Sequence, residues 1–287
     1  RPYIYNNETQ EFKPLLVERP SQSGLFFGWH PNSRQVLFWS LDVALWLADV
    51  ETGQAIPLAV FDGPMQAAAL SPDGQYVVYI AESDTSIRTI WMVSVAGSDA
   101  RVLVDIDGGG RVFGWSPDGK YVFMMAAPQL GVTEEAAAAL QKSHGLWLFN
   151  PQDNSFLPLA IPYLNGYGLV PTWSPDGRWV VSTGPVAVGD ADNLIDDDVC
   201  RKDRFFSQEC LFQNANVYIE NIETGEIRDI GRGTYPTWSP DGAKLAYVAR
   251  ENGTSVVKIA DVANSESGGS ALLTMDSFIH DLTWTPK

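Results

Sequence analysis

The sequence carries little positive charge: 19 Lys and Arg stand against 35 Asp and Glu among 287 residues, which gives a net charge of −16. Such a chain repels phosphate backbones and anionic membrane surfaces, so nucleic acid is a poor partner for it. No apolar run approaches the roughly 18 residues that span a bilayer, and no basic start is followed by an apolar stretch. We therefore expect no membrane insertion, and a monomeric domain.

Groups that perform catalysis are also scarce. The sequence has three histidines and two cysteines, and it contains no Gly-x-Ser-x-Gly, no His-Glu-x-x-His and no phosphate-binding glycine loop followed by Lys. We favour structural roles for His30, which lies in a turn, and for His280, which lies in an expected inner strand; the role of His144 stays open. These absences disfavour an enzyme without excluding one.

One pentapeptide recurs through the chain. Ser-Pro-Asp-Gly follows Leu70, Trp115, Trp173 and Trp238, and weaker copies begin at Trp29 and Trp284. Subtracting successive anchor numbers gives spacings of 41, 45, 58, 65 and 46 residues. Three of these spacings match the roughly 40–50 residues of one propeller blade, and two are longer.

Each copy predicts the same local structure. Pro, Asp and Gly in this order form a tight turn, and an alternating β-rich run follows each turn, as in 75–80 and 120–124. A second hairpin follows in each unit, so every unit has four expected strands. Residues 3–12 match that second hairpin, and residues 278–284 match a first strand, so the two ends would share a composite sixth blade. Its second strand either lies beyond Lys287 or does not exist.

The Trp-Ser-Pro-Asp-Gly copies resemble the TolB-type, WD-like propeller repeat of bacterial extracytoplasmic proteins, which also occurs in the propeller domains of prolyl-oligopeptidase-like enzymes. The resemblance covers essentially the whole chain, 1–287, as one domain. It implies an all-β fold, a six-bladed β-propeller of four-stranded antiparallel blades closed by both termini, and an extracytoplasmic location. It says little about function, because propellers host unrelated activities.

Two insertions, at about 126–144 and 184–214, break the repeat between the second and third strands of their units. The first contains a sequence suited to a short helix, at 133–143. We expect both insertions on the face that also carries the connections between blades, and we choose this face as the candidate recognition surface. Its candidate ligand-binding residues are Phe61, Asp62, Arg111, Tyr163, Asn165, Tyr167, Arg232 and Tyr235. Ordinary loop decoration is the alternative interpretation.

The second insertion carries five acidic residues within a short span. Oxygen ligands of this kind suit Ca²⁺, although the spacing does not match an EF-hand, and a solvated acidic loop is the alternative. The candidate metal ligands are Asp190, Asp192, Asp196, Asp197 and Asp198.

Two functions follow from these patterns. The first is a non-catalytic extracytoplasmic propeller that binds a protein or peptide partner through the insertion-bearing face. The alternative is a hydrolase or lyase domain that acts on a glycan or peptide at the channel mouth.

The only cysteines, Cys200 and Cys210, lie close together in the second insertion, and we predict a disulfide between them. Closing this loop should stabilise the protein by about 2.5–3 kcal/mol in the chain-entropy model. Peptide mass mapping without reductant should recover the two cysteines in one cross-linked peptide. A count of two free thiols would leave reduced cysteines, or a two-cysteine metal site, as the explanation.

Overall fold

The computed structural model describes residues 3–6, 9–14, 24–40, 44–60, 65–82, 88–97, 100–128, 146–163, 170–185, 215–277, 279 and 282–284. Within these ranges the fold is all-β, with one short 3₁₀ helix, η1 (Val262–Ser267), and no α-helix. No helix in the described part of the chain is long and apolar enough to cross a membrane. The chain divides into two compact units, of which the first contains Arg1–Leu140 and Trp147–Pro158, and the second Gln141–Leu146 and Leu159–Lys287.

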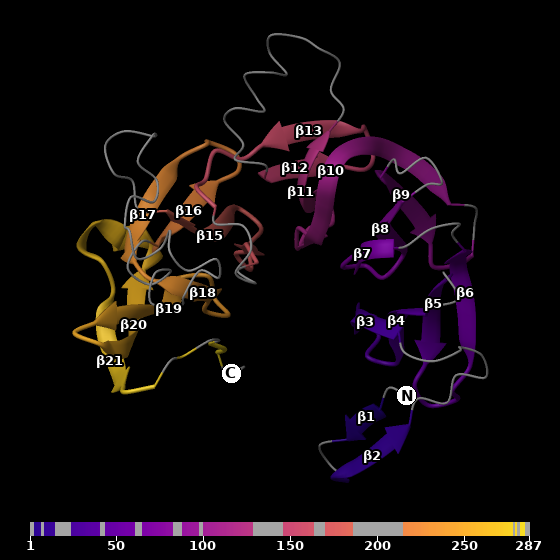
Figure 1. Cartoon of the computed structure of the whole chain (residues 1–287), viewed down its shortest axis with the longest axis horizontal. Helices are drawn as coiled ribbons and strands as arrows, with labels where there is room; N and C mark the ends of the chain where they lie inside the picture. The colour runs from indigo at the N-terminus through magenta and orange to yellow at the C-terminus, as the bar shows by residue number, and fades with distance from the viewer. Residues whose placement is uncertain are drawn as a thin grey trace, which may run out of the picture. The chain divides into compact units, whose positions relative to one another are not determined.

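The first unit begins with a two-stranded hairpin and continues with three four-stranded antiparallel blades (Figure 1). The hairpin consists of β1 (Tyr3–Asn6) and β2 (Glu11–Pro14). Blade 1 contains β3 (Gly24–Trp29), β4 (Gln35–Ser40), β5 (Ala44–Asp49) and β6 (Ala55–Val60). Blade 2 contains β7 (Met65–Leu70), β8 (Tyr76–Glu82), β9 (Arg88–Ser94) and the first part of β10 (Arg101–Trp115). Blade 3 contains the second part of β10, β11 (Val122–Pro128), β12 (Leu146–Asn150) and β13 (Ser155–Pro158).

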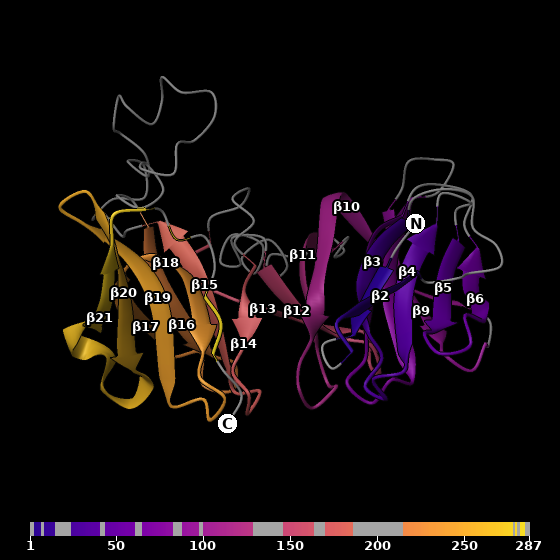
Figure 2. The same cartoon turned by 90° about the horizontal axis from the view of Figure 1, so that it is seen from below.

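The second unit contains two more blades of the same kind, and Figure 2 shows their strands from the side. Blade 4 contains β14 (Thr172–Trp173), β15 (Trp179–Pro185), β16 (Ala215–Asn221) and β17 (Ile227–Arg232). Blade 5 contains β18 (Thr234–Trp238), β19 (Lys244–Glu251), β20 (Thr254–Asp261) and β21 (Ser270–Met275). The expected four-stranded antiparallel unit is therefore confirmed five times.

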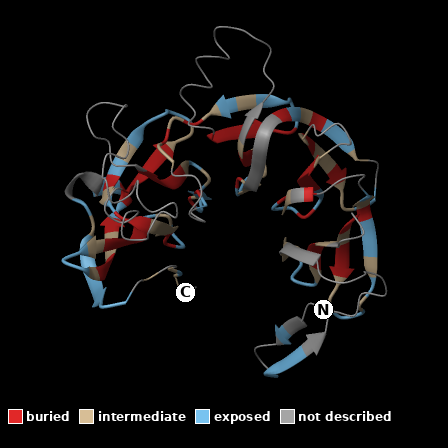
Figure 3. Ribbon diagram, viewed as in Figure 1, coloured by how far each residue is buried: buried red, intermediate tan, exposed pale blue. Residues whose placement is uncertain are grey.

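Strand alternation explains how the blades pack. Along β8, Val77 and Tyr79 join a buried cluster with blade 1, whereas Val78 and Ile80 join a second cluster with blade 3. Successive side chains of a strand point to opposite faces, so an inner blade needs apolar residues at consecutive positions and not only at every second one. The middle strands are buried for this reason, and fourth strands such as β21 are exposed (Figure 3).

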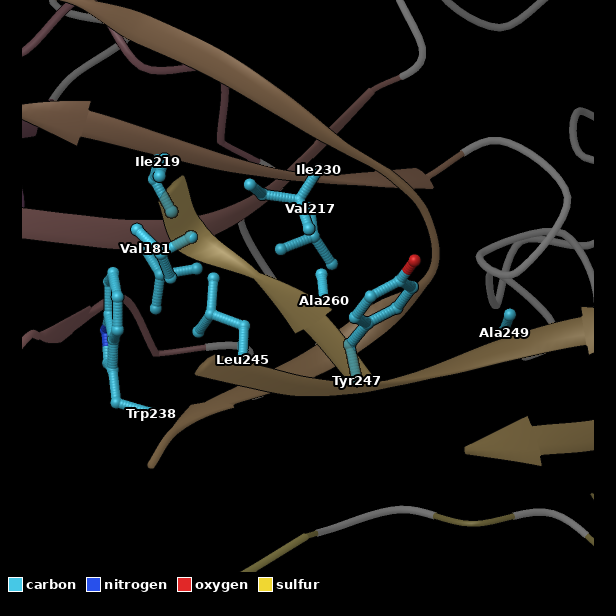
Figure 4. Close-up of a cluster of buried hydrophobic side chains, with 10 residues drawn as sticks. Val181, Val217, Ile219, Ile230, Trp238, Leu245, Tyr247, Ala249 and Ala260 are labelled. Carbon is cyan, nitrogen blue, oxygen red and sulfur yellow. The ribbon is translucent and has the colours of Figure 1, made fainter. Parts of the chain in front are cut away.

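The core of the second unit lies between blades 4 and 5 (Figure 4). Val181, Val217 and Ile219 from blade 4 meet Leu245 and Tyr247 from blade 5, and all five are buried. Burying branched side chains of this size stabilises a fold by about 1.5–3 kcal/mol each. This cluster holds the two blades of the unit together.

Each Ser-Pro-Asp-Gly turn is held by hydrogen bonds of its serine and aspartate side chains. Ser116 Oγ donates to Asp118 Oδ1 over 2.5 Å and accepts the Tyr121 N–H over 2.9 Å, while Asp118 Oδ1 also accepts the Lys120 N–H over 3.0 Å. The same three bonds recur in the turns of blades 2, 4 and 5. The turn glycines have φ near +70°, the left-handed region that favours glycine.

Blade 1 replaces that serine with His30, which confirms the structural role expected of it. The Asn32 N–H donates to His30 Nδ1 over 3.2 Å, and His30 Nε2 lies 3.0 Å from the carbonyl oxygen of Gly74 in the next turn. A Cβ on Gly74 would lie 2.4 Å from that Nε2. A side chain there would force the His30 ring to move, and the positive φ of Gly74 independently favours glycine.

The anchor tryptophans link successive blades within each unit. Trp115 Nε1 donates to the carbonyl oxygen of Ala69 over 3.0 Å, and Trp238 Nε1 donates to that of Thr172 over 3.4 Å. Trp284 Nε1 donates to the carbonyl oxygen of Thr237 over 3.1 Å. The last, incomplete copy of the pentapeptide thus makes the same indole hydrogen bond as the complete copies at Trp115 and Trp238.

The insertion boundaries and the last strand need correction. β11 continues to Pro128 and β15 to Pro185, so the long connections cover 129–145 and 186–214; the ladder of β15 continues because Pro185 still pairs with Ala215. Both do join second to third strands, as predicted. The expected strand at 278–284 is wrong for Ile279 and Leu282–Trp284, which lie in no strand. The helix at 133–143 lies outside the described residues, and the sixth blade stays a prediction.

The turn network leads to a test on Asp118. Asp118→Ala removes the acceptor of two hydrogen bonds and should lower the free energy of unfolding by about 1–2 kcal/mol. Asp118→Asn keeps an oxygen at Oδ1 and should lose less than half of that amount. Urea unfolding of both variants beside the wild type measures the difference; equal losses would show that the bonds to Oδ1 are not what matters.

Candidate functional site

The structure describes four of the eight predicted ligand-binding residues. Arg111 lies in β10, with only its backbone described. Tyr163 is half-buried, Arg232 is exposed at the end of β17, and Tyr235 is half-buried in β18. Phe61, Asp62, Asn165 and Tyr167 lie outside the described residues, as do Cys200, Cys210 and the five predicted metal ligands, Asp190, Asp192, Asp196, Asp197 and Asp198.

Tyr163, Arg232 and Tyr235 belong to one end of the second unit, which we call the insertion-bearing end. There β15 stops at Pro185 and β16 starts at Ala215, so the second insertion leaves and returns at this end. Asn216 pairs with Gly184 on one side and with Arg232 on the other. Arg232 therefore lies one strand away from the base of the insertion.

The segment 159–163 is bound to blade 4 at the same end. Ser182 Oγ donates to the carbonyl oxygen of Pro162 over 2.6 Å, and Leu159 and Ile161 are fully buried. A Cβ on Gly184 would lie 2.5 Å from Pro162 Cβ, so only glycine allows the segment to come this close. This contact places Tyr163, the next residue, beside the strand that leads into the insertion.

Glu220 of β16 binds the backbone of the segment 159–163. This residue was not predicted from the sequence. Its side chain is buried; Oε2 accepts the Ile161 N–H over 2.8 Å, and Oε1 accepts the Ala160 N–H over 3.2 Å. Burial raises the pKa of the carboxyl above its usual range, although the two N–H donors oppose this shift. The available signal was an acid at a third-strand position where the other blades have Ala48, Val93, Phe149 and Ala260.

Tyr235 has a backbone conformation that is rare for its residue type. Its φ is +53°, beside a register shift between Thr234 and Thr237. The preceding Gly233 has φ +156°, and a Cβ there would lie 2.5 Å from Tyr247 Cδ2. Burial raises the pKa of the Tyr235 hydroxyl. The bulge presents the side chain of Tyr235 in a way that a regular strand would not.

Three buried oxygens at this end have no hydrogen-bond partner in the described part of the chain: Thr183 Oγ1, Asn216 Oδ1 and Thr234 Oγ1. Asn216 uses its other atom, because Nδ2 donates to Asp229 Oδ2 over 2.7 Å, and Asp229 Oδ1 accepts the Gly231 N–H over 2.9 Å. Native folds rarely leave such groups unpaired. The three oxygens therefore leave hydrogen-bonding capacity unused at this end of the two blades.

Metal chemistry has no donor set in this part of the chain. Among the residues that the structure describes, no three His, Cys, Asp or Glu side chains lie close enough together to hold a metal ion. The predicted calcium ligands stay a prediction.

Comparisons with known proteins agree with this architecture. No family model matches the sequence, and no curated protein matches it. TolB from Acinetobacter baumannii has 17% identity and a TM-score of 0.51 over 96% of this chain and 61% of that one. An oligogalacturonate lyase in complex with manganese has 12% identity and a TM-score of 0.64 over 99% of this chain and 72% of that one. The tricorn protease has 10% identity and a TM-score of 0.53 over 92% of this chain and 27% of that one.

These likenesses, together with the five repeated blades, show a propeller-like fold for the chain. The chain spans about three fifths of the length of the Acinetobacter TolB. At such low identity the likeness does not extend to activity, since one fold serves a lyase and a protease alike.

The buried carboxyl gives a prediction with a definite pH dependence. Because the folded pKa of Glu220 is raised, its contribution to stability is fully present below the unfolded pKa and is lost as the pH rises through the folded value. The free energy of unfolding of the wild type relative to Glu220→Gln should therefore fall from pH 4 towards pH 7, as urea titrations at several pH values would show.

Glu220→Ala is the companion variant. It leaves the N–H groups of Ala160 and Ile161 unpaired in a buried site and, because neither variant titrates at this position, should be about 2–4 kcal/mol less stable than Glu220→Gln at every pH. A flat difference between wild type and Glu220→Gln across this pH range would contradict the raised pKa.

Proposed function

We propose that this chain is a non-catalytic, extracytoplasmic propeller domain that binds a protein or peptide partner through the insertion-bearing end. The extracytoplasmic location rests on the repeat, which resembles that of bacterial extracytoplasmic propellers, and on the likeness in fold to a TolB. The partner is a peptide segment that offers hydrogen-bonding groups and a side chain for an aromatic surface.

The unpaired oxygens carry this proposal. Thr183 and Thr234 are 2% and 0% exposed, and Asn216 is 6% exposed, so water has little access to them. Leaving a buried polar group unsatisfied costs about 1–3 kcal/mol. Because these atoms are closed to solvent, a partner recovers that free energy only where the strand ends open and let it donate to Asn216 Oδ1 or bond one of the two hydroxyls. Backbone N–H and C=O groups of a peptide supply both donors and acceptors.

One exposed and two half-buried side chains at the same end suit the same partner. Arg232 and Tyr235 are of residue types that are enriched at the centres of protein interfaces, and Tyr163 adds a second aromatic side chain. Arg232 ends β17 and pairs with Asn216 of β16, and Tyr235 lies in β18 just after Gly233. Tyr163 follows Pro162, which packs against Gly184. The surface is thus built on a rigid support, which lowers the ordering entropy that binding must overcome.

A second function, a lyase or hydrolase that acts on a glycan, is favoured by one observation, the TM-score of 0.64 with the manganese-containing oligogalacturonate lyase. We rank it below partner binding because the described residues of the insertion-bearing end offer hydrogen-bonding and aromatic groups without a paired acid and base. Calcium binding by the acidic insertion, through Asp190, Asp192, Asp196, Asp197 and Asp198, would add a third element to the same face.

Partner binding is tested by affinity capture from envelope extract and culture fluid of the source cells. The intact chain is compared with a variant in which Asn-Gly replaces 186–214, a two-residue turn that the pairing of Pro185 with Ala215 can accept. We expect the variant, and also Arg232→Ala with Tyr235→Ala, to lose at least tenfold in recovery of one specific partner.

The matched control is Arg178→Ala. This residue is an exposed arginine of the same blade, but it lies in the turn at the opposite end of β15. Its recovery should equal that of the intact chain. Equal recovery by all variants, with thermal unfolding showing that each is folded, would contradict the proposal.

A further inference from the structure

The first unit contains a cavity of about 710 Å³ between the turns of blades 2 and 3, which no predicted site residue lines. Its volume lies within the roughly 300–1,000 Å³ of small-molecule sites in proteins. Trp115, Met92 and the turn prolines form apolar walls, while Arg101 and the carboxylates of Asp73 and Asp118 add charge. The cavity lies at the turn-bearing end of its blades, and the insertion 129–145 leaves from the other end of β11.

An arginine spans the junction at this cavity, and the second unit repeats the contact. Arg101 Nη2 donates over 2.5 Å to the carbonyl oxygen of Pro151, the first residue after β12. Arg228 Nη1 donates over 2.8 Å to the carbonyl oxygen of Val262, the first residue after β20. The two arginines hold the same register position, since Arg101 pairs with Met92 and Arg228 with the corresponding Ile219.

The two junctions differ in what covers the arginine. The Arg228 guanidinium lies over the ring of Trp179, 4.7 Å from its centroid, and this indole packs against the cluster between blades 4 and 5. The residue in the place of Trp179 at the other junction is Tyr76; each gives its N–H to the serine of its own turn. Tyr76 is 39% exposed, and no aromatic ring of the described residues lies over Arg101.

We propose that this cavity binds an aromatic side chain of a peptide segment, with the ring over the Arg101 guanidinium as the Trp179 ring lies against Arg228. The chain thus carries, in its second unit, an internal copy of the bound state. A cation over an aromatic face is attractive, and the attraction grows when water is excluded by apolar walls such as Trp115 and Met92. Asp73 and Asp118 disfavour acidic neighbours in the ligand, so the segment is neutral or basic beside its aromatic residue.

The site is tested with N-acetyl-tryptophanamide as the probe and the whole chain labelled for NMR at its methionine methyls and indole N–H groups. We expect saturable shifts of the Met92 methyl and the Trp115 indole N–H, and much weaker ones with N-acetyl-leucinamide. Arg101→Ala should weaken binding of the probe by roughly two- to fivefold, the factor that an exposed cation–π contact supplies. Absence of saturable shifts in the wild type would overturn the proposal.

A pair of substitutions at one position gives the sharper test. Tyr76→Trp rebuilds the arrangement of Trp179 and Arg228 and should fill the cavity, raising the melting temperature and weakening probe binding at least tenfold. Tyr76→Phe keeps the cavity open and should bind the probe as the wild type does. Tyr76→Trp that folds and still binds the probe with unchanged affinity would show that the ring is not held over Arg101. These readouts are independent of the insertion-bearing end, so failure of either proposal leaves the other intact.

Discussion

A four-stranded blade of this protein cannot bury its own apolar faces, and this constraint organises the rest of the structure. Consecutive residues of β8 are buried on opposite sides, so blade 2 requires a neighbour on each face. The same holds for the cluster between blades 4 and 5, where Tyr247 and Leu245 alternate with residues that face away. Stacking of sheets thereby supplies the hydrophobic free energy that a single blade lacks. The indole and arginine hydrogen bonds add direct links between neighbouring blades within each unit.

Most of the blade architecture could be predicted from the sequence because it recurs. Ser116, Asp118 and the glycine after them define a turn by local chemistry alone, and each copy then sets the phase of the strands that follow. The N-terminal hairpin was predicted for the same reason, since residues 3–12 match the second hairpin of a blade. The strand expected before Trp284 failed because a strand needs a partner ladder, which a local pattern cannot supply; the Trp284 indole nevertheless bonds Thr237 as its counterparts do.

The candidate site was less predictable, for a physical reason. The residues predicted from the sequence were polar or aromatic side chains in expected loops, whereas the important groups at the insertion-bearing end are buried atoms within strands. Glu220 and Asn216 are defined by what they contact, namely the backbone of 160–161 and the carboxylate of Asp229. Comparing the third strands of all blades would have exposed Glu220, because an acid replaces apolar residues there. The unpaired oxygen of Asn216 could not be predicted, because only the folded structure shows which atoms lie within hydrogen-bond distance of it.

The long strand β10 serves two sheets at once. Residues 101–106 pair with β9, and residues 106–107 and 111–115 pair with β11, with a register shift between Asp107 and Arg111 at the three glycines 108–110. One continuous backbone therefore belongs to two hydrogen-bonded ladders, which form a single seven-stranded sheet. If β10 lost its pairing with one neighbouring strand, its pairing with the other would also be weakened, so blades 2 and 3 should unfold together as one cooperative element. At the other blade boundaries in the described part of the chain no strand is shared, and local unfolding of one blade can be independent of the next.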